Sequence, residues 1–359
     1  MKKVFFSKIK LEGPGKVWHN KREFDKYDIP LGGGDLEREL TMEFARVTEA
    51  AALASARWVG RGNKEAADDA AVEAMRSVFD TIRMNGTVVI GEGEMDEAPM
   101  LYIGESLGGG DGLELDVAVD PLEGTNIVAK GLTGAIAVVA IAKRGGLLHA
   151  PDMYMDKIAV GPAAKGRVHL DAPVKENLAN VAKALHKSMD DLTVVILDRP
   201  RHQELIRDVR ACGARIRLIS DGDVSPAVAC AFEGTGVDIM MGVGGAPEGV
   251  LAAAALRCMG GEMQGRLWPE NEEDVARARA LGIEDVQRLL TLDDLVRSDD
   301  VFFAATGITE GHLLRGVTFN AQGAMTHTVV MRGKTGTVRF IEARHSFEKK
   351  PKYAIKGAF

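Results

Sequence analysis

Apolar side chains first recur at helical spacing. Asp35 can cap a helix whose buried face is predicted from six residues that approximate one stripe: Leu36, Leu40, Phe44, Val47, Ala51 and Leu53. Gly60 and Gly62 end this helix. A second helix is predicted over 64–84, with Asp68 in its early turns and a buried face formed by Ala67, Ala71, Met75, Val78 and Phe79.

Short apolar segments then predict strands. Residues 87–90 form a buried strand that Gly91 ends, 114–120 alternate apolar and acidic residues as in a strand with one solvated side, and 135–142 are entirely apolar. After a division near 185–192, strands alternate with helices over 192–198, 203–212, 214–220, 237–241, 248–258, 301–305 and 310–314. Such alternation predicts an α/β architecture.

Composition bounds the function. The 359 residues are 46% hydrophobic and 27% charged, which excludes a disordered chain and suggests two domains or two coupled halves. A net charge of -7 argues against a dedicated nucleic-acid binder. No apolar run approaches the ~20 residues that span a bilayer, so we expect no membrane partner.

The first 34 residues differ from the rest. Eight Lys/Arg and four Asp/Glu give them +4, which leaves -11 on 35–359. They are predicted to be a mobile basic arm or an added segment; contact with an anionic partner is the alternative. Without a signal-like apolar run we expect a cytoplasmic protein, with plastid import left open.

Three widely spaced cysteines, Cys212, Cys230 and Cys258, favour a reducing compartment and buried thiols over disulfides. No local sequence marks any of them as a nucleophile.

Carboxylates gather where predicted strands end. Glu92 and Glu94 follow one strand, and Asp120 and Glu123 follow another. Such strand ends meet at one crevice, where several ionised carboxylates need cations between them. Oxygen ligands without nearby His or Cys favour Mg²⁺ or Mn²⁺ over zinc. The alternative is solvated loop acids, but two such stretches together favour a metal site.

The segment 120–125, Asp-Pro-Leu-Glu-Gly-Thr, has its own logic. Pro121 fixes the turn, Gly124 permits close backbone approach, and the N–H groups near Thr125 can receive a phosphate oxygen. The segment resembles the signature of the lithium-sensitive, metal-dependent sugar phosphatases. Longer segments resemble class II fructose-1,6-bisphosphatase in the same order, at 61–68, 88–104, 150–157, 198–202, 220–224 and 242–249. The resemblance runs from about Thr41 to Phe347, and cyanobacterial enzymes that also cleave sedoheptulose 1,7-bisphosphate are similarly close.

The resemblance implies a layered α-β-α-β-α sandwich with a metal-binding half over 35–188 and a substrate-binding half over 189–359. It implies hydrolysis of the 1-phosphate of fructose 1,6-bisphosphate, in gluconeogenesis or the Calvin cycle, by a homo-oligomer (a dimer or a tetramer). Two or more Mg²⁺ or Mn²⁺ ions would be held by Asp68, Glu92, Asp120, Leu122 (through its carbonyl), Glu123 and Glu248. Thr125 would align the attacking water with Asp68 and Glu92. Substrate contacts would come from Glu123, Gly124, Thr125, Tyr154, Arg199, Pro200, Arg201, Asp221, Gly222, Asp223 and Gly245.

Several of these residues have plainer interpretations when taken alone. Asp68 is typical of a surface acid in an early helical turn, and Tyr154, between two methionines, is typical of a core residue. Arg199 stands where some family members have Lys, and it could lie in a solvated loop with Arg201. Glu248 begins a helix after Pro247, a residue that fits the first helical position.

Two glycine-containing segments suggest alternative functions. The segment 242–249 has Pro247 where a dinucleotide-binding fingerprint needs its third glycine, so an oxidoreductase is the weaker alternative. Gly333-Lys-Thr335 lacks the first glycine of a P-loop and is better interpreted as a turn between strands. Another sugar or inositol phosphate monoesterase, or a non-catalytic sugar-phosphate sensor, is a further alternative.

Overall fold

The computed structural model describes residues 40–93, 99–110 and 112–349, all within a compact unit that spans Leu36–Phe359. The arm predicted over 1–34, the capping residue Asp35 and the acidic residue Glu94 lie outside the described residues.

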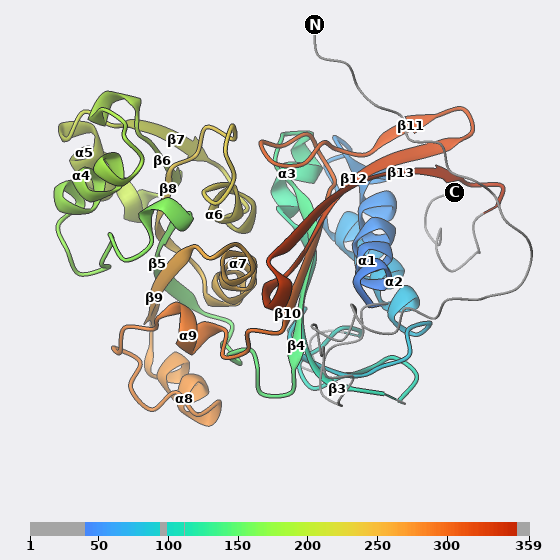
Figure 1. The fold of residues 1–359 in the computed structure, drawn as a ribbon. Coiled ribbons are helices and arrows are strands. Elements are labelled where there is room, and N and C mark those ends of the chain that lie inside the picture. The colour runs from blue at the N-terminus through green and yellow to red at the C-terminus, as the bar shows by residue number, and fades with distance from the viewer. Residues whose placement is uncertain (1–39, 94–98, 111, 350–359) are drawn as a thin grey trace, which may run out of the picture. The chain divides into compact units, whose positions relative to one another are not determined.

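The larger sheet contains eight described strands (Figure 1). In the order β2, β1, β3, β4, β10, β12, only β1 and β3 are parallel neighbours, and β11 and β13 also pair with β12. Their bounds are β1 (Asn85–Ile90), β2 (Ser106–Leu107), β3 (Glu114–Glu123), β4 (Ile136–Lys143), β10 (Val301–Gly307), β11 (Thr318–Asn320), β12 (Gly323–Arg332) and β13 (Thr337–Ser346).

The second sheet has the order β7, β6, β8, β5, β9. Strand β6 is parallel to both neighbours, whereas β5 is antiparallel to β8 and β9. The bounds are β5 (Tyr154–Val160), β6 (Thr193–Leu197), β7 (Arg215–Ile219), β8 (Ile239–Gly245) and β9 (Glu262–Trp268).

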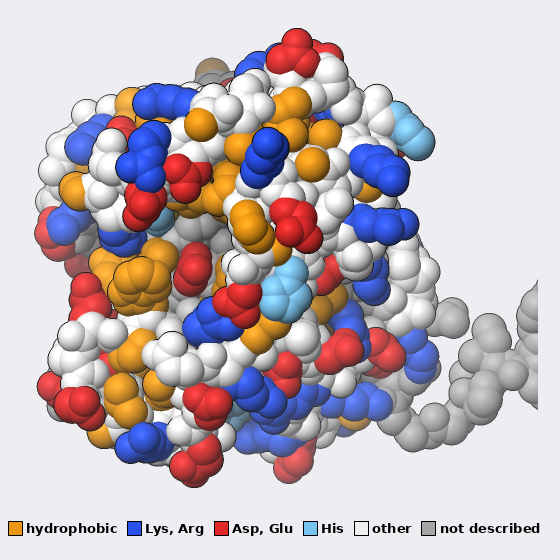
Figure 2. Space-filling view, turned by 90° about the vertical axis from the view of Figure 1, so that its left-hand side faces the viewer, with side chains coloured by type: hydrophobic (Ala, Val, Ile, Leu, Met, Phe, Trp, Pro, Cys, Tyr) orange, Lys and Arg blue, Asp and Glu red, His pale blue; other side chains and the backbone are white. Residues whose placement is uncertain are grey.

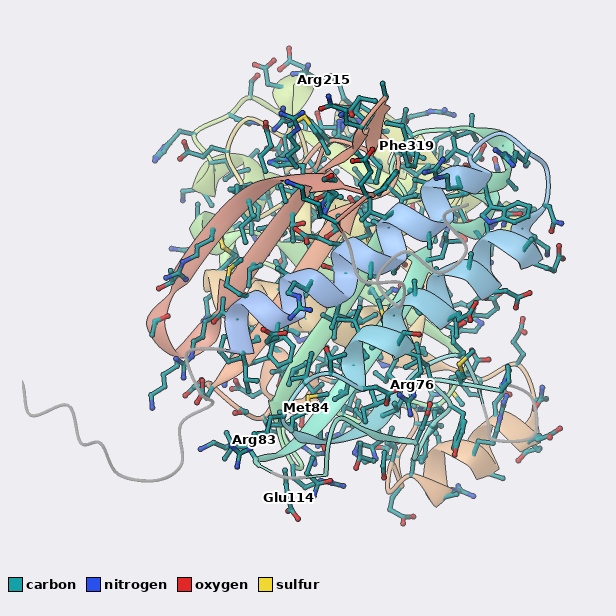
Figure 3. All side chains as sticks on the ribbon, turned by 90° about the vertical axis from the view of Figure 1, so that its right-hand side faces the viewer. Arg76, Arg83, Met84, Glu114, Arg215 and Phe319 are labelled. Atoms are coloured by element: carbon teal, nitrogen blue, oxygen red, sulfur yellow. The ribbon has the colours of Figure 1, made fainter. Side chains whose placement is uncertain are left out.

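Helices separate and cover the two sheets. The described helices are α1 (Leu40–Ser55), α2 (Lys64–Phe79), α3 (Thr125–Lys130), α4 (Val174–Ala184), α5 (Gln203–Ala211), α6 (Val224–Ala229), α7 (Ala246–Met259), α8 (Glu272–Ala280) and α9 (Leu292–Leu295). Helices α1 and α2 lie together on one face of the larger sheet (Figure 3). Helix α7 lies between the sheets, and α4 and α5 cover the far face of the second sheet (Figure 1).

Four clusters of buried apolar side chains, three large and one small, hold these layers together in the described part of the chain. Along β3, Val117 and Val119 face the core under α1 and α2, while Ala118 faces the core around α7. Both faces of this strand are therefore buried. The layers form an α/β sandwich, which confirms the predicted fold class.

Some expected elements differ. The solvated side predicted for 114–120 is wrong, because β3 is central and Asp116 is fully buried, where its Oδ2 accepts a hydrogen bond from the Leu147 N–H at 3.3 Å. The helix predicted over 64–84 ends at Phe79, where the hydrogen bonds tighten to i→i−3 (Thr81 N–H to the Val78 carbonyl and Ile82 N–H to the Phe79 carbonyl), although Ile82 is still buried. The segment 310–314 is not helical.

Other expectations hold. Residues Gly333–Thr335 form a 3₁₀ turn between β12 and β13, as predicted in place of a P-loop. All three cysteines are free; Cys258 is buried as expected, whereas Cys212 and Cys230 are partly exposed. None of the described helices has both the length and the apolarity needed to cross a membrane. Basic and acidic side chains are interspersed over the face shown in Figure 2.

The sheets divide the chain differently from the two predicted halves. Strand β5 precedes residue 188 but belongs to the second sheet, and β10 to β13 return to the larger sheet. Each sheet therefore contains strands from both predicted halves. The division into 35–188 and 189–359 stays a prediction.

Candidate active site

Three carboxylates converge where β3 ends and α7 begins. Oxygen atoms of Asp120, Glu123 and Glu248 all lie within 4.8 Å of one another. Asp120 and Glu123 come from the end of β3, and Glu248 comes from the first turn of α7, across the interface between the sheets. The sequence prediction that these three residues meet is a geometric fact of the fold.

A bulge lets Asp120 and Glu123 share one side of the strand. In a regular strand, residues three apart face opposite sides. Here the register with β4 shifts between Asp120, which pairs with Val138, and Glu123, which pairs with Ile136. Pro121 lies in this irregular stretch, where its lack of an N–H costs no ladder hydrogen bond.

Glu248 lies where the backbone leaves room for it. Gly245 precedes α7, and a Cβ at this glycine would stand 1.8 Å from Glu248 Oε2. That Oε2 is buried and has no hydrogen-bond partner among the described residues. Helix α7 begins at Ala246, so Pro247 is its second residue, not the first as predicted from the sequence.

Asp68 and Glu92 join the same cluster. Burial and the neighbouring Asp69 raise the pKa of Asp68 to about 6, although a hydrogen bond with Glu92 opposes the rise. Burial, the charge of Asp68 and the charge of Glu248 raise the pKa of Glu92 to about 8. Asp68 is therefore not the solvated helical acid that its local sequence alone would favour.

Asp120 and Glu123, the two acids of β3, are subject to the same burial and electrostatic repulsion. Burial, and then the charges of nearby carboxylates, raise the pKa of Asp120 and Glu123 well above the ordinary range. Single backbone donors oppose this: the Leu122 N–H to Asp120 Oδ1 at 3.0 Å, and the Val224 N–H to Glu123 Oε1 at 2.9 Å. One N–H per carboxylate does not offset the repulsion within the cluster.

The donor set fits hard divalent cations. Every side-chain donor is a carboxylate oxygen, and the buried, unsatisfied Glu248 Oε2 points to a missing positive partner. The five acids line one cavity of about 380 Å³, called here the acidic crevice. Leu122, Gly124 and Thr125 line it as well. The cluster can therefore hold metal ions.

Thr125 begins α3 after Gly124, whose φ of 97° is a conformation that favours glycine. Thr125 and Asp68 both line the acidic crevice, but no hydrogen bond joins them in the described part of the chain. The alignment of a water between them stays a prediction.

Helix α2 also holds the segment 101–105, which lies against Gly91 next to Glu92. Arg76, labelled in Figure 3, donates through Nε to Glu105 Oε1 at 2.5 Å, and Glu105 in turn accepts from the Leu101 N–H. Gly91 is needed for this close approach, since a Cβ there would stand 1.9 Å from the Leu101 carbonyl oxygen. Sequence reasoning did not single out Arg76 or Glu105.

A second cavity, of about 520 Å³, adjoins the crevice and is called here the arginine cavity. The two cavities share four acidic wall residues: Glu123, Asp152, Asp221 and Glu248. The predicted substrate residues that line the arginine cavity are Glu123, Tyr154, Arg199, Arg201, Asp221, Gly222, Asp223 and Gly245. Pro200 is not a lining residue; it starts the 3₁₀ turn Pro200–His202 between the two arginines.

Arg201 is held in place. Its Nε and Nη2 donate to the Val243 carbonyl at 3.1 and 2.8 Å, and its guanidinium lies 4.4 Å from the centre of the Tyr154 ring. Tyr154 is thus a wall residue of the cavity and not only a core residue. Arg199 is looser, with Nη2 3.7 Å from Asp221 Oδ1.

His202 supports the same strand. Its Nδ1 is 2.7 Å from the Leu197 carbonyl oxygen, and its Nε2 accepts from the Val243 N–H at 2.7 Å. Burial lowers the pKa of the ring, and both nitrogens are occupied by the backbone. This agrees with the expectation that His202 supports the loop and is not a base.

Sequence reasoning missed several wall residues. Asp152 lines both cavities, and Arg277, with Asn271 and Asp274, closes the arginine cavity from α8 and the turn before it. Nothing local marks them. The fully buried Lys157 was also missed, although it ends one of the segments that carry the family resemblance.

Comparisons with known proteins agree with this geometry. Residues 38–345 match the family model described as bacterial fructose-1,6-bisphosphatase, glpX-encoded. A Synechococcus protein named D-fructose 1,6-bisphosphatase class 2/sedoheptulose 1,7-bisphosphatase is 48% identical over 334 residues, covering 86% of this chain and 96% of its own length. Fructose-1,6-bisphosphatase 1 class 2 of Escherichia coli is 47% identical over 328 residues, covering 88% and 97%. With its acidic crevice and arginine cavity in place, this chain belongs to the glpX-encoded bacterial fructose-1,6-bisphosphatase family.

Proposed function

We propose that this protein hydrolyses the 1-phosphate of fructose 1,6-bisphosphate, giving fructose 6-phosphate and phosphate, with Mg²⁺ or Mn²⁺ bound. The observation that carries the proposal is the acidic crevice opening onto a cavity lined by arginines. A bisphosphate needs both: a site where one phosphoester is attacked, and cations that hold the phosphate that stays.

The metal ions would be held by Asp68, Glu92, Asp120, Glu123 and Glu248, with the Leu122 carbonyl as an added ligand. When bound, they would supply a water of lowered pKa and positive charge for the phosphoryl oxygens.

The chain's own groups would orient the reacting parts. Thr125 lies at the N-terminus of α3, so its hydroxyl can accept or donate a hydrogen bond to a water in the crevice. The backbone N–H groups that follow Gly124 offer donors to phosphate oxygens. Asp68 and Glu92 line the crevice together with Thr125, so their carboxylates can accept a hydrogen bond from that water.

The arginines would hold the distal phosphate. Arg201 cannot swing freely, because the Val243 carbonyl and the Tyr154 ring fix its plane. Arg199 has more freedom, so it would close on the phosphate from the other side. Holding the distal group positions the reacting one without any direct contact to it.

A panel of sugar phosphates assayed against each metal tests the proposal. Phosphate release from fructose 1,6-bisphosphate should require added Mg²⁺ or Mn²⁺, and ³¹P spectra should show loss of the C1 phosphate. Activity that persists without divalent cations, or that prefers inositol phosphates, would overturn it.

Sedoheptulose 1,7-bisphosphate is the second candidate substrate. The printed names of two Synechococcus relatives, each 48% identical to this chain, include that activity. Equal turnover of both bisphosphates in the same panel would support it. The oxidoreductase alternative finds no support, since Gly242 and Gly244 lie within β8 and not in a strand-to-helix turn.

We further propose a cytoplasmic homo-oligomer, a dimer or a tetramer, on the strength of the family resemblance. Light scattering of the purified full chain checks the oligomeric state.

A further inference from the structure

A lysine is buried beneath the arginine cavity. Lys157 lies in the middle of β5 with a side chain that is 0% exposed. Its Nζ is 2.6 Å from Asp223 Oδ2 and donates a hydrogen bond to the Gly245 carbonyl at 2.8 Å. Both of these partners line the cavity that would take the sugar.

We propose that Lys157 is a positioning residue: it fixes Asp223 and the end of β8 so that they can receive the hydroxyl groups of the sugar. The inference rests on the proposed function and concerns substrate recognition, not the chemical step.

The energetics of burial favour a positioning role for Lys157 over a contribution to the stability of the fold. Removing an ammonium and a carboxylate from water costs several kcal/mol each, and apolar residues of similar volume are often as stable. Lys157 lies at a site that an aliphatic side chain could fill, between strands β8 and β9. The retained charge therefore indicates a need to hold Asp223.

Two glycines make room for the pair. A Cβ at Gly244 would stand 1.9 Å from Asp223 Oδ2 and 3.0 Å from Lys157 Nζ. A Cβ at Gly249 would stand 3.3 Å from Lys157 Cδ. Gly244 and Gly249 thus leave room for side chains of the protein itself. The glycines of the 242–249 segment are therefore explained by the Lys157–Asp223 ion pair as well as by a bound ligand.

Two cationic side chains each bind a backbone carbonyl near the end of β8. Arg201 binds the carbonyl of Val243, and Lys157 binds that of Gly245. Gly245 directly precedes α7, which carries Glu248. Lys157 therefore supports the wall that the arginine cavity shares with the acidic crevice.

The test compares Lys157→Met, which keeps length but removes charge, with Lys187→Met. Lys187 makes a similar pair, 2.6 Å from the buried Asp238, at the other end of β6 from the cavity residues. We expect Lys157→Met to raise KM for fructose 1,6-bisphosphate by about tenfold or more, the loss of one charged hydrogen bond. Lys187→Met should leave KM unchanged.

A second readout does not need the metal-loaded enzyme. Calorimetric binding of fructose 6-phosphate to the metal-free protein should weaken by a similar factor in Lys157→Met. Inorganic phosphate, which has no sugar hydroxyls, should bind equally well to wild type and Lys157→Met in the same metal-free experiment. Unchanged fructose 6-phosphate binding, or an equal loss of phosphate binding, would overturn the inference.

The double variant Lys157→Met/Asp223→Asn covers the case in which the single variant does not fold. Removing both charges should restore the unfolding midpoint but not KM, whereas recovery of both together would assign Lys157 a structural role only. A wild-type protein that binds fructose 6-phosphate yet does not hydrolyse the bisphosphate would refute the proposed function and leave this inference standing.

Discussion

The acidic crevice and the arginine cavity share walls but balance their charges differently. In the arginine cavity, Asp223 is paired with Lys157, and Asp221 lies 3.7 Å from Arg199. Among the five clustered acids of the acidic crevice, Glu248 has a described cation nearby: burial raises the pKa of Glu248, and Lys157 opposes the rise. Asp221 and Asp223 of the arginine cavity therefore have cations of the chain beside them, whereas the clustered acids of the crevice leave an excess of negative charge that metal ions would offset.

The difference teaches where each region obtains its order. Within the chain itself, Lys157 holds Asp223, and the Val243 carbonyl holds Arg201. In the metal-free crevice, burial and mutual repulsion favour protonated carboxylates. Bound metal ions would replace those protons. Variants can test each half of this contrast separately.

The largest effect should come from removing one crevice charge. Asp120→Asn or Glu92→Gln should lower phosphate release by about 1000-fold or more, since several kcal/mol of electrostatic stabilisation would be lost. Circular dichroism should show an intact fold. Near-normal activity in both variants would contradict the metal assignment, and Glu204→Gln, on exposed α5, is a matched control.

The pH dependence of metal-free stability comes next. Asp68 and Glu92 have folded pKa values of about 6 and 8, above their ordinary values of 3.8 and 4.5. The folded state therefore keeps protons that the unfolded chain releases, so the free energy of unfolding should fall as pH rises from about 4 to about 8.

Urea titrations of metal-stripped protein at pH 5 and pH 8 measure this fall, which should amount to a few kcal/mol. Glu92→Gln should flatten the upper part of the curve. Stability that rises over this range would show that the crevice acids are compensated within the chain.

Metal addition should restore order to the crevice with a moderate effect. At a Mg²⁺ or Mn²⁺ concentration of 100 times Kd, the free energy of unfolding should rise by about 2.7 kcal/mol. Asp120→Asn should lose most of this gain, while Asp274→Asn, which lines the arginine cavity and not the acidic crevice, should keep most of it. Equal gains in the two variants would contradict the assignment of the metal site to the acidic crevice.

The smallest effect concerns the arginine cavity. Arg201→Ala should raise KM for fructose 1,6-bisphosphate by about 10- to 100-fold through loss of a charge-assisted contact. Fructose 1-phosphate, which lacks the distal phosphate, should be affected much less. Arg207→Ala, an exposed arginine on α5, serves as the control; equal losses on the two esters would refute the proposed role of Arg201.

Local signals predicted what is local. The run 135–142 predicts β4 almost to the residue, and the apolar stripe of α2 predicts where that helix begins but not where it ends, because burial acts directly on these side chains. The acids Asp120 and Glu123 were found because they end such a run. By contrast, the sequence cannot show that Asp116 is covered, because its burial depends on neighbours that lie elsewhere in the chain.

The remaining features depend on distant pairing. The bulge that lets Asp120 and Glu123 share a side exists only against β4, and the position of Lys157 depends on α6 and β8. The assignment of β5 to the second sheet and of β10 to the first follows from the same long-range contacts. The family resemblance brought Asp68 and Glu248 into the site, since spacing alone favoured a surface acid and a helix start.

The pairing of β4 with β10 has a consequence for synthesis. Between Lys143 and Val301 the ribosome must produce the entire second sheet, a delay of roughly 10–30 s at ordinary elongation rates. During that interval β4 exposes an open edge to other nascent chains, while Asp120 and Glu123 are already out of the exit tunnel. Chaperone demand should therefore peak late in translation, fall when 301–307 emerges to cover β4, and end when 323–332 pairs with the other side of β10.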